Sequence, residues 1–411
     1  MQQISDSEFA PEAPEVQALQ QPVPTGSEQR QWLAWLRRPS AALRQTMFLF
    51  GVTRLLFALV TYFGYILFNA GKYSPASVGV GNLLASWDQW DAKWYLGIVQ
   101  QGYHDPLQAA FFPLYPLLVK LGSLPFGDGV AYPVALVVSN IAFFFALWAL
   151  RVLAEREVGP EAAARATLYL ALFPTALFFF APYNESLFVL LAVACFLALR
   201  RGQWLLAGGV ALLAALTRSA GIFLVVPFAI EYAQQHGWQW RRARLDALAI
   251  ILIPLGLGLY SLYCWVQFGD PLAFAHVQIH WGRTLQWPWA GLWNQLVILA
   301  HAQPASFFQA HNLLDLAATL MMIALVSLGW RRLPLAYSCY ATVLLANFLL
   351  FPQAFNDALA SNQRFALEVF PAFLTLGLLV RRPAIHQAIV IIFTSLLSLL
   401  TLVFITGRWL V

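Results

Sequence analysis

The sequence has few charged residues. Asp, Glu, Lys and Arg make up only 10% of its 411 residues, whereas a soluble domain carries about 25%. Hydrophobic residues make up 60%, and the mean hydropathy is +0.65. This composition excludes a mainly disordered chain and a soluble enzyme, and it predicts an all-α, polytopic membrane protein.

Cysteine is also scarce, and the common catalytic and metal-binding motifs are absent. The three cysteines lie far apart inside apolar runs, which excludes a disulfide framework. No H-E-x-x-H, Walker loop or G-x-S-x-G occurs. His276 and His280 are four residues apart, but two histidines without a third ligand more often form hydrogen bonds than bind a metal. We therefore expect no metal site.

The net charge of +5 is better explained by the orientation of the protein in a membrane than by binding to nucleic acid. Basic residues collect in short loops between apolar runs, as the positive-inside rule predicts for cytoplasmic loops. If the N-terminus is cytoplasmic, most of the 24 lysines and arginines fall on the cytoplasmic side. We expect membrane lipids as partners and no nucleic acid.

Apolar runs predict about eleven membrane-spanning helices. Residues 1–40 are predicted to be a cytoplasmic polar tail and a basic amphipathic segment, followed by a transmembrane domain over residues 41–411. The two long loops, 71–128 and 268–311, then lie on the extracytoplasmic face, where we look for chemistry. The expected spans are 46–70, 129–151, 166–181, 185–200, 204–217, 219–233, 246–267, 312–329, 334–352, 365–380 and 386–406.

The first outer loop carries two carboxylates close together. If residues 86–95 are helical, Asp88, Asp91 and Tyr95 share one face, with tryptophans on an adjacent face. Such a helix would lie in the membrane interface. The alternative is an interfacial anchor whose acids only face water. Farther along the loop, Pro113 forbids a regular helix through it, and the apolar residues 111–118 are expected to lie along the outer leaflet.

Three further charged residues are expected at the outer ends of spans. Glu185 is costly at that depth unless it is paired or faces water. Arg218 pairs with Glu185 or Asp91, or holds a phosphate. Arg364 has Glu368 one turn away as its expected partner. The charged residues converge on one membrane face, whereas a proton pump would place acids deep within its spans.

With these motifs the chain resembles the PIG-V-type mannosyltransferases, and it resembles a bacterial-type member of that family. The resemblance runs from about residue 46 to 380. The matching blocks are Trp90-Asp91-x-x-x-Tyr95-x-x-Ile98-x-x-x-Gly102-Tyr103, Phe111-Phe112-Pro113-Leu114-Tyr115-Pro116, Phe173-Pro174-Thr175, Ala181-Pro182-Tyr183-Asn184-Glu185-Ser186, Thr217-Arg218-Ser219, Gly269-Asp270-Pro271 and Gln363-Arg364-Phe365.

The resemblance implies GT-C architecture with interfacial helices in the first extracytoplasmic loop. It implies transfer of a sugar, mannose in the founding member, from a polyprenyl-phosphate donor such as dolichyl-phosphate mannose to a glycolipid or glycan hydroxyl. It also implies that an acid in the first outer loop is the catalytic base, a role that falls on Asp91. The expected location is the bacterial cytoplasmic membrane, with the active site on the extracytoplasmic side.

The charges that develop during sugar transfer predict further catalytic and binding residues. The departing phosphate needs cations and the acceptor hydroxyl needs a base, while the monophosphate leaving group needs no metal or other cofactor. Asp88 is a second catalytic candidate beside Asp91, as an assisting group or as the base itself. A transporter or flippase of lipid-linked sugars and a non-catalytic scaffold are the alternatives. The donor-phosphate candidates are Arg218, Arg364, Lys93, Arg283 and His280, and the substrate-binding candidates are Tyr95, Tyr115, Tyr183, Asn184, Glu185 and Gln363.

Overall fold

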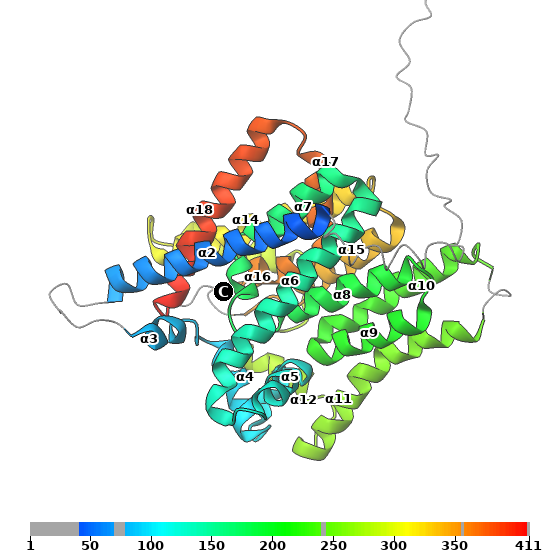
Figure 1. Cartoon of the computed structure of the whole chain (residues 1–411), viewed down its shortest axis with the longest axis horizontal. Helices are drawn as coiled ribbons and strands as arrows, with labels where there is room; N and C mark the ends of the chain where they lie inside the picture. The colour runs from blue at the N-terminus through cyan, green and yellow to red at the C-terminus, as the bar shows by residue number, and fades with distance from the viewer. Residues whose placement is uncertain (1–40, 70–78, 240–243, 355–356, 409–411) are drawn as a thin grey trace, which may run out of the picture. The chain divides into compact units, whose positions relative to one another are not determined.

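The computed structural model describes residues 41–69, 79–239, 244–354 and 357–408. The expected tail and amphipathic segment over residues 1–40 lie outside these ranges. Within them the chain folds into helices, with one isolated β-bridge between Arg283 and Gln353 (Figure 1). The predicted all-α fold is confirmed.

Among the described residues, five helical segments are long and apolar enough to cross a membrane. They expose large apolar side chains such as Phe48 and Leu67, as lipid-facing helices do. The protein is an integral membrane protein. The segments are α2 (Ala41–Asn69), α6 (Ala131–Val158), η6 (Leu245–Ile251) continued by α11 (Leu252–Phe268), α14 (Phe307–Gly329) and α18 (Pro383–Ile405).

The other expected spans contain shorter helices, so the total of eleven crossings stays a prediction. The expected span 166–181 is not one helix. It is interrupted after Leu172, because Pro174 has no N–H to donate and the residue before it, Phe173, is extended. The shorter helices are α7 (Pro160–Leu172), η3 (Ala176–Phe179), α8 (Glu185–Leu199), α9 (Trp204–Thr217), η4 (Ser219–Leu224), α10 (Val225–Gln235), α15 (Leu335–Leu350), α16 (Asn362–Phe365), η8 (Ala366–Glu368) and α17 (Phe370–Leu379).

The core forms where α6 and α8 pack together, with α9 on α8 and α7 on α6. Close approach of helix backbones requires small residues. At Gly377 of α17, a Cβ atom would lie 2.4 Å from the carbonyl oxygen of Ala162 in α7. Glycine at this position therefore sets the distance between α17 and α7.

We expect Gly377→Ala to lower the thermal stability of the purified protein, because the added methyl group meets backbone that cannot rotate away. Overpacking of this kind costs about 1–3 kcal/mol. Gly258→Ala is the matched control in α11, since its Cβ would meet nothing within 4 Å. Thermal unfolding followed in detergent measures both variants, and equal melting temperatures would contradict the packing role of Gly377.

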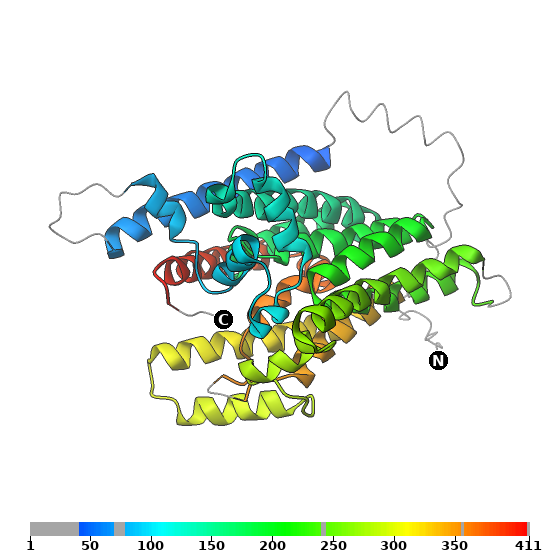
Figure 2. The ribbon, with the colours of Figure 1, turned by 90° about the horizontal axis from the view of Figure 1, so that it is seen from below.

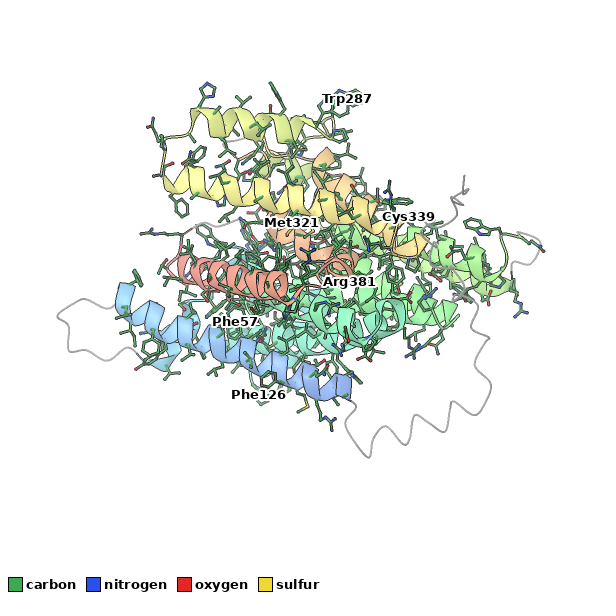
Figure 3. The ribbon with its side chains drawn as sticks, turned by 90° about the horizontal axis from the view of Figure 1, so that it is seen from above. Phe57, Phe126, Trp287, Met321, Cys339 and Arg381 are labelled. Carbon is green, nitrogen blue, oxygen red and sulfur yellow. The ribbon has the colours of Figure 1, made fainter. Side chains whose placement is uncertain are left out.

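Helices α13 (Ala290–His301) and α14 pair as an antiparallel hairpin, drawn in yellow in Figure 2. Tryptophans gather on and before α13, and Trp287, Trp289 and Trp293 all expose most of their surface. Trp287 lies at the edge of the molecule (Figure 3). Tryptophan is enriched at membrane–water interfaces, and we expect this end of the hairpin to sit there.

Candidate active site

The first outer loop folds into short helices, and those after residue 90 are grouped with α12 (Ala273–His276) at one end of the helical domain (Figure 1). The helices are α3 (Val80–Ala85), α4 (Asp91–Gln101), η1 (Pro106–Ala110) and α5 (Leu114–Ser123). Helix α5 begins after Pro113, as the sequence predicts. Tyr115 in its first turn is fully buried and hydrogen-bonds the carbonyl oxygen of Ala135 and the hydroxyl of Ser139.

The expectation that Asp88 shares a helical face with Asp91 and Tyr95 is wrong. Helix α4 begins at Asp91, and Trp90 just before it has a φ of 53°. A tryptophan in this region is strained, which separates the turn that holds Asp88 from the helix. Asp91 is therefore the first residue of a helix, and Tyr95 lies one turn later.

Glu185 lies at the centre of a buried ion cluster. It is the first residue of α8, and its side chain is 0% exposed. Its Oε1 accepts from Nη1 of Arg218 at 2.9 Å and from Nε of Arg364 at 2.5 Å. One carboxylate oxygen thus joins two guanidinium groups from distant parts of the chain.

Each of the two arginines also binds one further acid. Arg364 binds Oδ2 of Asp91 at 2.6 Å, and Arg218 binds Glu368 at 2.8 Å. Arg218 also donates to Oδ1 of Asn184 at 2.8 Å. The predicted pair Arg364–Glu368 is therefore wrong. Of the two partners expected for Arg218, the structure selects Glu185.

Asp91 is the most exposed carboxylate of this cluster. Its side chain is 23% exposed, against 0% for Glu185 and 1% for Glu368. Arg364 holds its Oδ2, and no described residue hydrogen-bonds its Oδ1. One carboxylate oxygen is thus oriented by Arg364, and the other has no hydrogen bond to a described residue.

Aromatic side chains fix the position of Asp91. The backbone N–H of Asp91 donates to the hydroxyl of Tyr183 at 3.2 Å, and that hydroxyl donates to the carbonyl oxygen of Gln89 at 2.9 Å. The guanidinium of Arg364 lies 4.7 Å from the centre of the Tyr183 ring. Burial, with Glu185 next, raises the pKa of Tyr95 well above its usual value, so this phenol stays neutral.

Asp88 stands apart from the ion cluster. It has no ion pair with an arginine in the described part of the chain, and its Oδ1 is buried without a hydrogen bond. Burial raises the pKa of its carboxyl group, and Lys93 partly opposes this shift. The structure thus connects only one of the two predicted catalytic acids to the arginines.

The three remaining phosphate candidates differ in position. Lys93 and His280 are exposed, and neither has a described contact with the cluster. Arg283 lies beside the cluster, because its guanidinium and that of Arg218 both contact the ring of Phe365, at 5.1 and 5.5 Å.

Arg283 is hydrogen-bonded to carbonyl oxygens, and the acids Asp357 and Asp315 act on its charge only at longer range. It donates only to the carbonyl oxygens of Phe351 and Ala360, and no described carboxylate forms an ion pair with it. Burial lowers its pKa to about 10, which leaves the group cationic at neutral pH. Arg218 and Arg364, in contrast, are already neutralised by carboxylates.

Hydrogen bonds of Gln363 hold the chain in place next to Arg364. Its backbone and side-chain N–H groups donate to Asp315 at 3.3 and 3.4 Å, and its carbonyl oxygen accepts from Thr175 at 2.7 Å. These contacts hold the residue that precedes Arg364. Sequence reasoning did not single out His311, which contacts Asp315; its spacing of four residues from that acid is the signal that could have found it.

Residues 66–240 match the family model described as Mannosyltransferase (PIG-V). The resemblance to the PIG-V family is confirmed. The PIG-V match contains Asp91, Glu185 and Arg218, whereas Arg283 and Arg364 lie outside it.

Curated relatives of PIG-V type agree with this match. The GPI alpha-1,6-mannosyltransferase 2 of Rattus norvegicus is 28% identical over 210 residues, which cover 46% of this chain and 42% of the relative. The protein of the same name from Homo sapiens is 30% identical over 133 residues, covering 30% of this chain and 27% of the relative. The chain thus matches less than half the length of these relatives.

Among solved structures, the chain is similar to ArnT from Cupriavidus metallidurans bound to undecaprenyl phosphate. The identity is 16% and the TM-score 0.47, over 83% of this chain and 62% of ArnT. A TM-score of this size carries no argument about function. The number of crossings and the membrane sidedness stay predictions.

Proposed function

We propose that the protein is a membrane glycosyltransferase that moves mannose from a polyprenyl-phosphate donor to a hydroxyl of a glycolipid or glycan. Asp91 carries the proposal. It is the most exposed carboxylate of a buried ion cluster, its Oδ1 has no hydrogen bond to a described residue, and it lies in the segment that matches the PIG-V mannosyltransferases. Carboxylates positioned in this way serve as general bases.

The proposed reaction is a single displacement. The acceptor oxygen attacks the anomeric carbon while Oδ1 of Asp91 takes its proton. The bond between the anomeric carbon and the phosphate oxygen breaks, and polyprenyl phosphate leaves with the electron pair. The new bond forms opposite the old one, so the configuration at the anomeric carbon inverts.

The donor phosphate is proposed to bind at Arg283, with Arg218 and Arg364 adding positive charge nearby. A guanidinium group can bind two phosphate oxygens at once. Arg283 does not first have to break an ion pair with a carboxylate. Lys93 and His280 lie farther out, where they can meet the donor on approach. No metal is needed at this phosphate. Exposed Leu117 and Leu121 of α5 can pack against the isoprenoid chain.

The substrate-binding candidates divide into two proposed roles. Tyr183, Asn184 and Gln363 position the charged residues through the hydrogen bonds described above. Tyr95 and Tyr115 are buried and pack against each other at 5.0 Å between ring centres, so they form the wall behind Asp91.

We expect Arg283→Gln to raise the KM for the lipid-linked donor about 10- to 100-fold, with a smaller effect on kcat. A hydrogen bond to a charged group is worth about 1.5–3 kcal/mol, which corresponds to this range. Steady-state kinetics with varied donor measure the effect. The control is Arg332→Gln, which removes an exposed arginine away from the cluster. An unchanged KM in Arg283→Gln would remove this arginine from the phosphate site.

The proposal is tested by sugar transfer in liposomes. Purified protein receives polyprenyl-phosphate mannose and a panel of glycolipid and glycan acceptors, and both the mannosylated product and free polyprenyl phosphate are quantified. A transferase produces both. A flippase, the alternative function, moves the intact donor across the bilayer and consumes none of it.

The proposed orientation places the N-terminus in the cytoplasm and the ion cluster on the extracytoplasmic side of a bacterial cytoplasmic membrane. The excess of basic residues in the expected cytoplasmic loops supports it. Single cysteines are introduced into the first outer loop, and whole cells are treated with a membrane-impermeant thiol reagent. Labelling of these cysteines supports the extracytoplasmic position of the loop.

A further inference from the structure

A second cluster of polar side chains lies outside the ion cluster. His311 and Asp315 are on α14, and Asp357 lies in the segment before α16. Nε2 of His311 is 2.8 Å from Asp357 and 3.5 Å from Asp315. The three potential ligand atoms all lie within 4.8 Å of one another. This cluster has no part in the proposed transfer.

Arg283 is near enough to act on both carboxylates of this cluster, but it forms no ion pair with either of them. Asp315 is 0% exposed and Asp357 only 13%. Neither forms an ion pair with a described lysine or arginine, and the described contact of Oδ2 of Asp357 is with Nε2 of His311 at 2.8 Å. Two buried, ionised carboxylates repel each other unless a proton or a cation lies between them. His311 can supply one such charge only when it is protonated.

We infer that His311, Asp315 and Asp357 bind a divalent cation, Zn²⁺ or Mn²⁺. An imidazole nitrogen with two carboxylate oxygens is a ligand set that both cations accept. Such ligands bind Zn²⁺ at about 2.0–2.2 Å, which places ligand atoms about 3–4 Å apart. To reach this geometry, His311 and Asp357 must move slightly apart from their 2.8 Å, while the 3.5 Å between His311 and Asp315 already fits. All three ligands come from described segments that already contact one another.

The cation would stabilise the segment that carries Arg364. Asp315 accepts from the backbone and side chain of Gln363, and Asn362 donates to Thr319 one turn along α14. A metal bound at Oδ2 of Asp315, the oxygen that also faces His311 and Gln363, would fix the orientation of this carboxylate. The site is therefore a structural one, separate from the donor phosphate, and it does not depend on the proposed activity.

The test is Mn²⁺ binding to the purified full chain after treatment with a chelator. The signal of free Mn²⁺ in electron paramagnetic resonance is followed during titration, and added Zn²⁺ then competes. We expect one bound Mn²⁺ per chain, released by Zn²⁺, and a higher melting temperature with either ion. No saturable binding by the wild type would overturn the inference and leave a protonated His311 as the balancing charge.

Two variants locate the binding. Asp357→Asn is expected to weaken Mn²⁺ binding at least about tenfold, and His311→Ala to do the same. The matched control is Asp270→Asn, because Asp270 also contacts a histidine, His276, at 2.7 Å, but in an exposed pair without a third ligand. Equal losses in all three variants, or unchanged binding in the first two, would place the ion elsewhere and contradict the inference.

Discussion

Replacing Asp91 with Asn is expected to lower sugar transfer about 10²- to 10⁴-fold, the usual contribution of a general base. The amide keeps the shape of the side chain but cannot accept the acceptor's proton. Its oxygen can still accept from Arg364, so binding of the donor at Arg283 should persist. Transfer rates and donor binding by wild type and variant, measured in the same liposomes, check both statements.

Asp88→Asn is the matched control for this prediction. Asp88 lies three residues earlier in the same loop but has no described ion pair with the arginines, and it precedes the helix that begins at Asp91. We expect its transfer rate to stay within about tenfold of the wild type. If Asp88→Asn is inactive and Asp91→Asn is not, Asp88 is the base and Oδ1 of Asp91 has another purpose.

Arg218→Gln is expected to destabilise the fold strongly. Arg218 is the described ion-pair partner of Glu368, and it shares Glu185 with Arg364. Both carboxylates are fully buried, and removing one partner of a buried ion pair typically costs about 3–5 kcal/mol. Thermal unfolding in detergent, with the yield of folded protein, measures this cost.

Two comparisons make the Arg218 result specific. Arg156→Gln removes an exposed arginine from α6 and should leave the melting temperature unchanged. Adding Glu368→Gln to Arg218→Gln should recover part of the stability, because the double variant no longer buries an unpaired Glu368. Strictly additive losses would show that the two residues do not interact in the folded protein.

Much of the membrane architecture could be predicted from sequence, because hydropathy is a local property of the chain. Helices α9 and α14 lie within the expected spans or overlap them closely. The interruption at Phe173 was missed because the apolar run continues through Pro174, and hydropathy does not register a lost hydrogen-bond donor.

The charged residues of the candidate site could be predicted from the sequence, but the ion pairs between them could not. Asp91 is expected from the sequence in the first outer loop, and Glu185, Arg218 and Arg364 at the outer ends of spans. The structure joins all four. Asp91 and Arg364 are 273 residues apart, so sequence spacing says nothing about their contact.

The error about Asp88 has a local cause. The helical pattern of acids and tryptophans suggested one continuous helix, but Trp90 takes a positive φ. Nothing in the side-chain pattern distinguishes such a strained turn from a helix, because tertiary contacts stabilise it. The separation of Asp88 from Asp91 therefore became visible only in the structure.

The central claim is that the ion cluster around Asp91 catalyses a single displacement at an anomeric carbon. The most direct measurement is the anomeric configuration of the mannoside formed by the wild type, determined by nuclear magnetic resonance beside that of the donor. The account predicts inversion, with one polyprenyl phosphate released for each mannose transferred. Retention of configuration would contradict it, because a single displacement from the side opposite the leaving group always inverts the anomeric carbon.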